Sequence, residues 1–148
     1  MREILFRGKR MNNGEWVYGS YAYQYGCHEI LLKECDGEYG SDNYHVKPET
    51  VGQFTGLIDK HGKKIFEGDI VKQIYSLNTQ ERPIISTIEY GISWAYSNVC
   101  GVCQRFRDGS GVSLLSVGDE SGVVYCEVIG NIHDNPELLL WEANRWTD

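Results

Sequence analysis

Long hydrophobic runs and positive charge are both scarce in this sequence. Its apolar runs, such as residues 138–140, are far shorter than the ~20 residues that a helix needs to cross a bilayer. Charged residues interrupt the apolar positions of residues 1–8, which disfavours a signal peptide. We therefore expect a protein with no membrane contact that works in a bacterial cytoplasm.

The shortage of positive charge restricts the classes of partner. Lys and Arg number 14 against 21 Asp and Glu, which gives a formal net charge of -7. Residues 119–148 hold seven acids against Arg145 alone, and such a field repels phosphate backbones. The bases among the first eleven residues form too short a cluster for a nucleic-acid-binding arm. We interpret them as part of a solvated first strand and turn, and nucleic acid is disfavoured as a partner.

The five cysteines do not form a recognisable framework of disulfides or metal ligands. Their odd number and irregular spacing indicate reduced thiols. Only Cys100 and Cys103, in Cys-Gly-Val-Cys, have the spacing of a metal-binding pair, but structural zinc needs four ligands and a second pair is missing. A redox pair would open a helix after a strand, and glycine-rich sequence follows instead. We predict no cofactor and no metal, with zinc at Cys100 and Cys103 as the alternative.

Three acidic residues lie near one another in the middle of the sequence, at Asp59, Glu67 and Asp69. Clustered carboxylates serve Mg²⁺ binding or general acid–base catalysis. Asp residues also cap tight turns, and we prefer that interpretation for Asp59 and Asp69. The histidines have no metal-ligand spacing and the glycine-rich segments match no phosphate-binding motif, so we predict no catalytic residues.

Tyr21, Tyr23 and Tyr25 occupy alternate positions, so a strand would place all three on one face. A buried face would make them core. An exposed face would make them a protein interface or a stacking platform for bases. The nearest bases in sequence, Arg10 and Lys33, are not adjacent, which disfavours nucleic acid. Core and interface both stay open, and the three tyrosines are the candidate interface.

The alternation of β-forming segments with glycine turns predicts a mainly β fold with antiparallel strands. We expect a single domain over residues 1–148, with a β meander in residues 1–49 and a small barrel-like part in residues 50–148. The strands expected in the meander are residues 3–7, 15–25 and 28–33.

Two further elements are expected towards the C-terminal end. Residues 112–117 and 123–129 have the pattern of a hairpin around a glycine-rich turn. Asn135 followed by Pro136 is a helix start signal, because Asn is a favoured cap and Pro fits the first helical position. We expect a short helix over residues 136–140.

Three blocks of the sequence resemble one known family. Residues 50–72 run Thr-Val-Gly-Gln-Phe-Thr-Gly-Leu-Ile-Asp-Lys-His-Gly-Lys-Lys-Ile-Phe-Glu-Gly-Asp-Ile-Val-Lys, with turns at Asp-Lys-His-Gly and Glu-Gly-Asp. Together with residues 2–7 and 128–139, this segment resembles the YopX family of phage and prophage proteins. Residues 8–49 and 73–126 match nothing in it. The resemblance implies a small, self-associating phage or prophage protein, and it brings no catalytic residues.

We therefore predict a non-enzymatic phage or prophage accessory protein in the cytoplasm of a bacterial host cell. It would form a homo-oligomer and bind a phage or host protein. The first alternative is a nucleic-acid-binding small-barrel module. The second is a metal-dependent enzyme that uses the three carboxylates or the thiols of Cys100 and Cys103.

Overall fold

The structure is a computed structural model, and it describes residues 3–32, 43–74, 83–93, 99–105, 111–113 and 125–144 of the chain. Antiparallel strands make up most of these residues and one short helix follows near the C-terminal end, which confirms the predicted fold class. The chain forms two compact units, residues 1–54 and 55–148, and the boundary lies inside strand β5 (Gly52–Ile58). That residues 1–148 act as a single domain stays a prediction.

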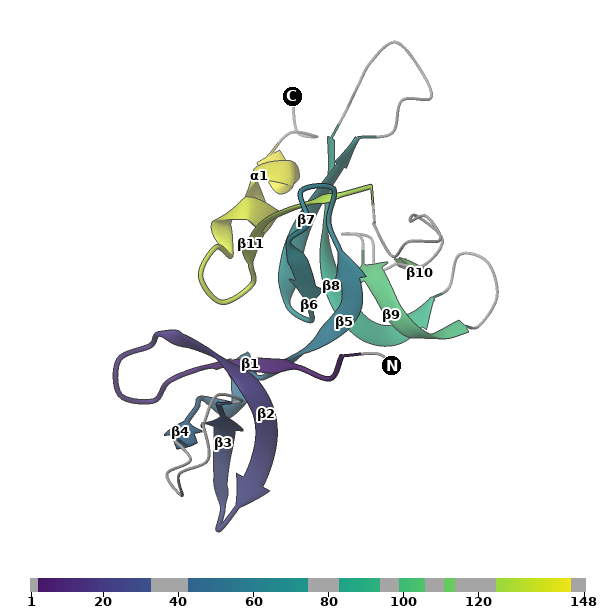
Figure 1. The fold of residues 1–148 in the computed structure, drawn as a ribbon. Helices are drawn as coiled ribbons and strands as arrows, with labels where there is room; N and C mark the ends of the chain where they lie inside the picture. Colours follow the sequence, from purple (N-terminus) through teal and green to yellow (C-terminus); the bar gives the residue numbers. More distant parts are fainter. Residues whose placement is uncertain are drawn as a thin grey trace. The chain divides into compact units, whose positions relative to one another are not determined.

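A meander of four short strands forms the sheet of the first unit (Figure 1). Its antiparallel order is β4-β3-β2-β1, and the start of β5 pairs with β1. Gly14 and Gly26 close the turns with φ of +72° and +81°, which a residue with a Cβ avoids. The predicted meander is confirmed, with strand ends shifted by up to three residues. The strands are β1 (Phe6–Lys9), β2 (Trp16–Gln24), β3 (Cys27–Leu31) and β4 (Asn43–His45).

The buried face of this meander is centred on Ile30 and Val46, which are almost inaccessible to solvent. A bridge between Arg10 and Val46 brings the end of β1 next to the residue that follows β4. The sheet therefore bends over its own apolar side chains. A 3-10 turn, η1 (Pro48–Thr50), then leads the chain into β5.

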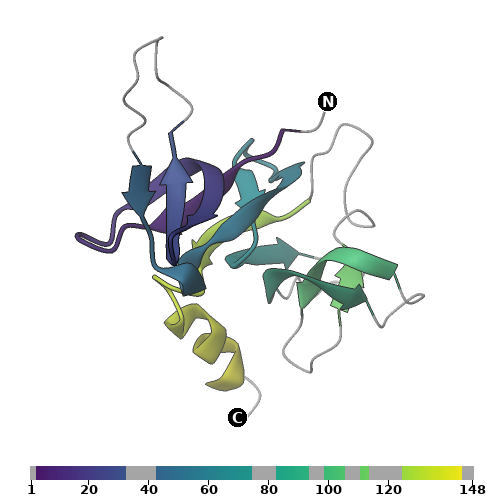
Figure 2. The ribbon, with the colours of Figure 1, turned by 90° about the horizontal axis from the view of Figure 1, so that it is seen from below.

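The second unit is built on a five-stranded antiparallel sheet in the order β10-β9-β8-β7-β11. Figure 2 shows helix α1 joined to β11 by a short turn. Within the described ranges neither sheet closes into a barrel, so the part after residue 50 is an open sheet. The elements are β6 (Lys64–Phe66), β7 (Asp69–Ile74), β8 (Pro83–Ser93), β9 (Val99–Arg105), β10 (Gly111–Ser113), β11 (Glu127–Asn131) and α1 (Glu137–Asn144). No helix in the described part of the chain has the length and apolarity needed to span a membrane.

The core of the second unit gathers residues from distant parts of the sequence. Half of this core comes from the segment between Leu57 and Val71, in which pairs of apolar residues lie between tight turns. Close packing against the later strands excludes water from these side chains, which is the main favourable term in folding. The cluster consists of Ile65, Val71, Ile88, Cys126 and Val128, with Leu57 packed against it.

Two expectations for the second unit differ from the structure. The hairpin between residues 112–117 and 123–129 is wrong, because β10 pairs with β9 while β11 pairs with β7 at the opposite edge. The expected turn, residues 118–122, lies outside the described residues. Strand β9 covers a segment for which the pattern predicts no strand.

The helix is confirmed, but α1 is longer than expected and its cap differs. The N–H of Leu138 donates to the main-chain carbonyl of Asn135 (3.1 Å). The side-chain oxygen of Asn135 points back to β11 and accepts a hydrogen bond from the N–H of Asn131 (3.3 Å). Asn135 therefore ties the helix start to the strand before it.

Candidate functional site

The turn between β5 and β6 carries a buried carboxylate, that of Asp59. The N–H of Gly62 donates to the Asp59 carbonyl (2.9 Å) and Gly62 has a φ of +80°, so the turn predicted from Asp-x-x-Gly is confirmed. The Asp59 N–H donates to the carbonyl of Lys63 (2.8 Å) and closes the hairpin. Asp59 is only 1% exposed, although it lies in a turn.

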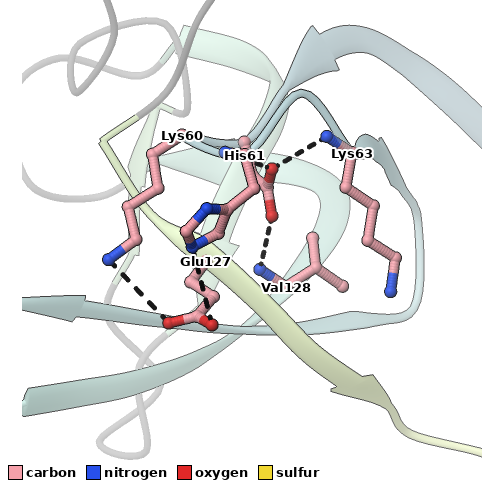
Figure 3. A network of polar contacts seen from close by, with 6 residues as sticks. Lys60, His61, Lys63, Glu127 and Val128 are labelled. Atoms are coloured by element: carbon pink, nitrogen blue, oxygen red, sulfur yellow. Dashed lines mark hydrogen bonds and ion pairs between the residues drawn. The ribbon is translucent and has the colours of Figure 1, made fainter.

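Both oxygens of the Asp59 carboxylate accept hydrogen bonds from the main chain (Figure 3). Oδ1 accepts from the N–H groups of His61 (2.9 Å) and Lys63 (2.9 Å), within the same turn. Oδ2 accepts from the N–H of Val128 in β11 (3.0 Å), which is 69 residues further along the chain. One side chain therefore joins the hairpin to a distant strand.

These bonds seal an edge of the five-stranded sheet. β11 is the outermost strand on its side, and an outermost strand presents unpaired N–H and C=O groups to solvent. Here the Val128 N–H is taken by Asp59, and the carbonyl of Cys126 accepts from the N–H of Lys60 (3.0 Å). The turn between β5 and β6 thus occupies two of the positions where another strand would add.

Charged side chains lie over the same junction, at the surface. Glu127 is 3.8 Å from the Nζ of Lys60 and 3.7 Å from the Nε2 of His61. All three side chains are substantially exposed, and exposed ion pairs contribute little to stability. The buried carboxylate is therefore the main polar link between the turn and β11.

Opposing effects set the pKa of Asp59. Burial raises the pKa, because the charged form loses its hydration. The hydrogen bonds from Val128, Lys63 and His61 favour the charged form, and their sum brings the pKa below the ordinary value of 3.8. Asp59 is therefore ionised at neutral pH, and its oxygens are held by the main chain. That arrangement suits a structural link better than proton transfer.

Asp69 has a matching role at the next turn. It is 1% exposed, and its Oδ2 accepts a hydrogen bond from the N–H of Phe66 (2.8 Å). The interpretation of Asp59 and Asp69 as turn caps is confirmed. Glu67 is half-buried and lies between them in sequence. Within the described ranges, no group of three or more His, Cys, Asp or Glu is placed to hold a metal ion.

The cysteines with described side chains are thiols in different settings. Cys126 lies in the core, and burial, with the nearby charges of Asp59 and Asp69, raises its pKa to about 12. Cys103 is buried in β9, and the side chain of Cys100 lies outside the described residues. A strand alternates faces at each residue, so positions 100 and 103 fall on opposite faces of β9. Zinc at this pair stays the alternative to the predicted absence of metal, and the strand geometry disfavours it.

The candidate tyrosines lie on the hairpin formed by β2 and β3. A two-residue turn, Tyr25-Gly26, joins the strands, and φ is positive at both positions (51° and 81°), as in a type I′ turn. Tyr25 therefore lies in the turn, outside β2. The expectation that all three tyrosines share a strand face is met by Tyr21 and Tyr23 alone.

His28 on β3 contacts both of these strand tyrosines. The Tyr21 hydroxyl lies 2.7 Å from Nδ1 of His28, and Tyr21 also packs against Phe6 with ring centroids 5.6 Å apart. The Tyr23 ring lies 4.8 Å from the imidazole of His28 but stays 63% exposed. Tyr25 is fully exposed. Tyr21 thus borders the core, while Tyr23 and Tyr25 form an aromatic tip on the surface.

The early basic residues lie over aromatic rings, a contact that the sequence pattern did not signal. The Arg7 guanidinium is 4.7 Å and the Lys9 Nζ 5.6 Å from the Trp16 ring centroid, and Arg10 is 4.2 Å from that of Tyr44. Such cation–π contacts contribute about 0.5–1 kcal/mol at exposed sites. Arg7 is buried, so the expectation of a wholly solvated basic segment is wrong.

Comparison with known proteins gives a family and a likeness to solved structures. The family model described as YopX protein matches residues 5–140. The crystal structure of protein EF1440 from Enterococcus faecalis is similar with a TM-score of 0.53 and 23% sequence identity, over 94% of this chain and 99% of that one. At that identity the likeness concerns the fold. No curated protein matches the chain.

Proposed function

The chain belongs to the YopX protein family, and we propose that it is a non-enzymatic phage or prophage accessory protein that acts by self-association and by binding another protein. Its place of action is the cytoplasm of the bacterial host. The observation that carries this proposal is the exposed aromatic tip of the β2–β3 hairpin, Tyr23 with Tyr25.

Tyrosine is a favoured residue of protein interfaces, because it offers a large apolar ring with a polar end. Tyr23 packs on His28 in the absence of any partner, with ring centroids 4.8 Å apart. Ordered aromatic side chains lose little conformational entropy on association, which favours binding. The tip therefore has the composition of a binding surface, and one of its two rings packs on a neighbouring side chain.

The turn itself adds support for a role of Tyr25. A residue with a Cβ incurs a conformational penalty of roughly 1 kcal/mol in the left-handed region, and Asn or Gly is preferred at this position of a type I′ turn. Tyr25 adopts a φ of 51° and has no core contact to compensate, because it is fully exposed. A strained, exposed aromatic residue is better explained by what it binds than by folding.

Sedimentation velocity over a wide range of protein concentration tests the proposal. We expect the wild-type protein to show a sedimentation coefficient that rises with concentration. Combined replacement Tyr23→Ser and Tyr25→Asn removes the aromatic tip and should abolish the rise. Tyr125→Ser is the matched control, since Tyr125 in the second unit is equally exposed (62%) and lies outside the hairpin.

Affinity capture tests the binding of another protein. The tagged protein and the tip variant are incubated with nuclease-treated lysate of phage-infected cells, and bound proteins are identified by mass. A stoichiometric protein captured by the wild type but lost with the tip variant supports the proposal. A strictly monomeric protein that captures nothing would overturn both halves of it.

A further inference from the structure

Part of β2 has no neighbouring strand on one side. β1 pairs with β2 from Lys9↔Trp16 to Phe6↔Gly19, whereas β3 pairs with residues 20–24 on the other side. Before Phe6 the chain leaves β2 and follows β5, since the carbonyl of Leu5 accepts from the N–H of Phe54 (2.8 Å) (Figure 1). Within the described ranges, residues 20–24 therefore form an uncovered strand edge.

The hairpin geometry determines which main-chain groups this edge presents. In antiparallel pairs, alternate residues bond to the partner strand, and the pair that flanks a two-residue turn is hydrogen-bonded. Gln24↔Cys27 flanks the turn, so Gln24 and Ala22 bond to β3. Tyr21 and Tyr23 then direct their N–H and C=O groups to the uncovered side. The same alternation holds on β3, where the N–H of Val46 donates to the carbonyl of His28 (2.9 Å).

This edge lacks the features that normally prevent strand addition. Charged side chains, proline and bulges protect exposed edges in most β proteins. Residues 20–24 are Ser-Tyr-Ala-Tyr-Gln, with no charge and no proline, and their pairing with β3 has no bulge. The chain carries a net charge of -7, so two copies repel one another in general, and this neutral stretch avoids adding to that repulsion.

We propose that two copies of the chain pair through this edge, with antiparallel β2 strands and Ala22 of each copy at the two-fold axis. The inference rests on the proposed self-association and names its surface. Tyr21 then lies opposite the partner's Tyr23 as a hydrogen-bonded pair, and the reverse pair is identical by symmetry. Two aromatic cross-strand pairs of this kind add side-chain contact to the main-chain bonds.

The central position suits this pairing. Ala22 meets the partner's Ala22 as a non-hydrogen-bonded pair, in which the Cα atoms approach to about 4.5 Å. The side chain at that position has to be small, and alanine satisfies the requirement. The paired segment is short, so the dimer is weak and concentration-dependent, as for other small interfaces.

Engineered disulfides test the register directly. Ala22→Cys is placed in a Cys27→Ser background, because Cys27 is half-exposed on the neighbouring strand. A non-hydrogen-bonded pair brings the two new cysteines within disulfide range. Gln24→Cys in the same background is the matched control. It lies on the same face of β2, but roughly 13 Å from its symmetry mate in this register, given about 3.3 Å per residue.

The expected result is a disulfide-linked dimer of the Ala22→Cys protein under mild oxidation, seen on a non-reducing gel and absent after reduction. Its yield should exceed that of the Gln24→Cys and Cys27→Ser proteins at least tenfold and rise with concentration. Equal cross-linking of the two cysteine variants, or none above the background, overturns the pairing. Cross-linking only to another protein in lysate would assign the edge to a segment of that protein and also overturn it.

Sedimentation velocity of the wild type separates the two proposals. Self-association without Ala22→Cys cross-linking would leave the proposed function standing and refute this edge. A wild type that stays monomeric would refute self-association and the edge together.

Discussion

Replacing Asp59 by asparagine tests whether its carboxylate holds β11 to the β5–β6 turn. The substitution keeps the size of the side chain, and the amide carbonyl oxygen can still accept the two hydrogen bonds within the turn. The amide nitrogen, however, would face the N–H of Val128, so a donor would meet a donor. The substitution therefore breaks the long-range bond and removes the charge that strengthens the others.

The expected loss of folding stability in Asp59→Asn follows from these contacts. A hydrogen bond to a charged group contributes about 1.5–3 kcal/mol, and a neutral acceptor gives roughly half as much. One bond lost and two weakened correspond to about 3 kcal/mol at pH 7, a large share of a typical stability of about 5–15 kcal/mol. Glu127→Gln is the control, since it removes only exposed ion pairs and should cost less than about 1 kcal/mol.

Urea unfolding gives the free energy of each variant, and its pH dependence tests the cause. The pKa of Asp59 in the folded protein lies below its ordinary 3.8. The stability that comes from its charge is therefore fully present above the unfolded pKa and is lost as pH falls through the folded pKa. The difference between wild type and Asp59→Asn should be constant from pH 7 to about pH 5 and shrink below pH 3.8.

Two results would refute the reasoning. One is a free energy for Asp59→Asn within about 0.5 kcal/mol of the wild type at pH 7, the range of ordinary surface substitutions. The other is a difference that stays constant into acid. Hydrogen exchange supplies a local readout, because the amide of Val128 should lose protection in Asp59→Asn and keep it in Glu127→Gln.

Three further predictions concern single positions. Gly19→Ala should lower the free energy of unfolding in urea by about 3 kcal/mol, because a Cβ at this position collides with the Leu31 carbonyl. A change in that free energy below about 0.5 kcal/mol would contradict the prediction. Tyr25→Asn should raise the unfolding free energy by about 1 kcal/mol, since Asn suits the positive φ there; a loss of stability would argue for a packing role. Cys126 should resist a thiol reagent at pH 8 in the native state, because burial raises its pKa to about 12. Half-exposed Cys27 should react with the same reagent. Rapid modification of Cys126 without unfolding would refute its burial.

Local features of this fold can be predicted from the sequence, because the residues that cause them are neighbours in the sequence. The turn at residues 59–62 depends on an aspartate and a glycine at fixed spacing, and both are visible in the sequence. The same holds for the strand alternation of β2 and for the helix start after Asn135. The distant partner of Asp59 is not readable, because no local pattern links residue 59 to Val128.

The missed features have physical reasons too. β9 contains glycine and cysteine among its seven residues, so its β-forming signal is weak, and pairing with β8 and β10 determines its conformation. The false hairpin assumed that neighbouring strands in sequence pair with one another, whereas β10 and β11 lie at opposite edges. The alternate spacing of the tyrosines also does not show where the strand ends. A two-residue turn requires a residue besides Gly26, and that residue is Tyr25.

Two strand edges of the chain differ in how far their main-chain groups are occupied: the edge of β11 and residues 20–24 of β2. This contrast supports a binding role for the edge of β2. At β11, a buried aspartate and the Lys60 N–H occupy edge groups, at the cost of burying a charge. At residues 20–24 of β2, one lysine in place of Ala22 would protect the edge without burying anything. That position instead carries a small neutral residue between two tyrosines whose main-chain groups point outwards. An edge that is this easily blocked, and is left open beside an exposed aromatic tip, is best explained by a strand that adds to it.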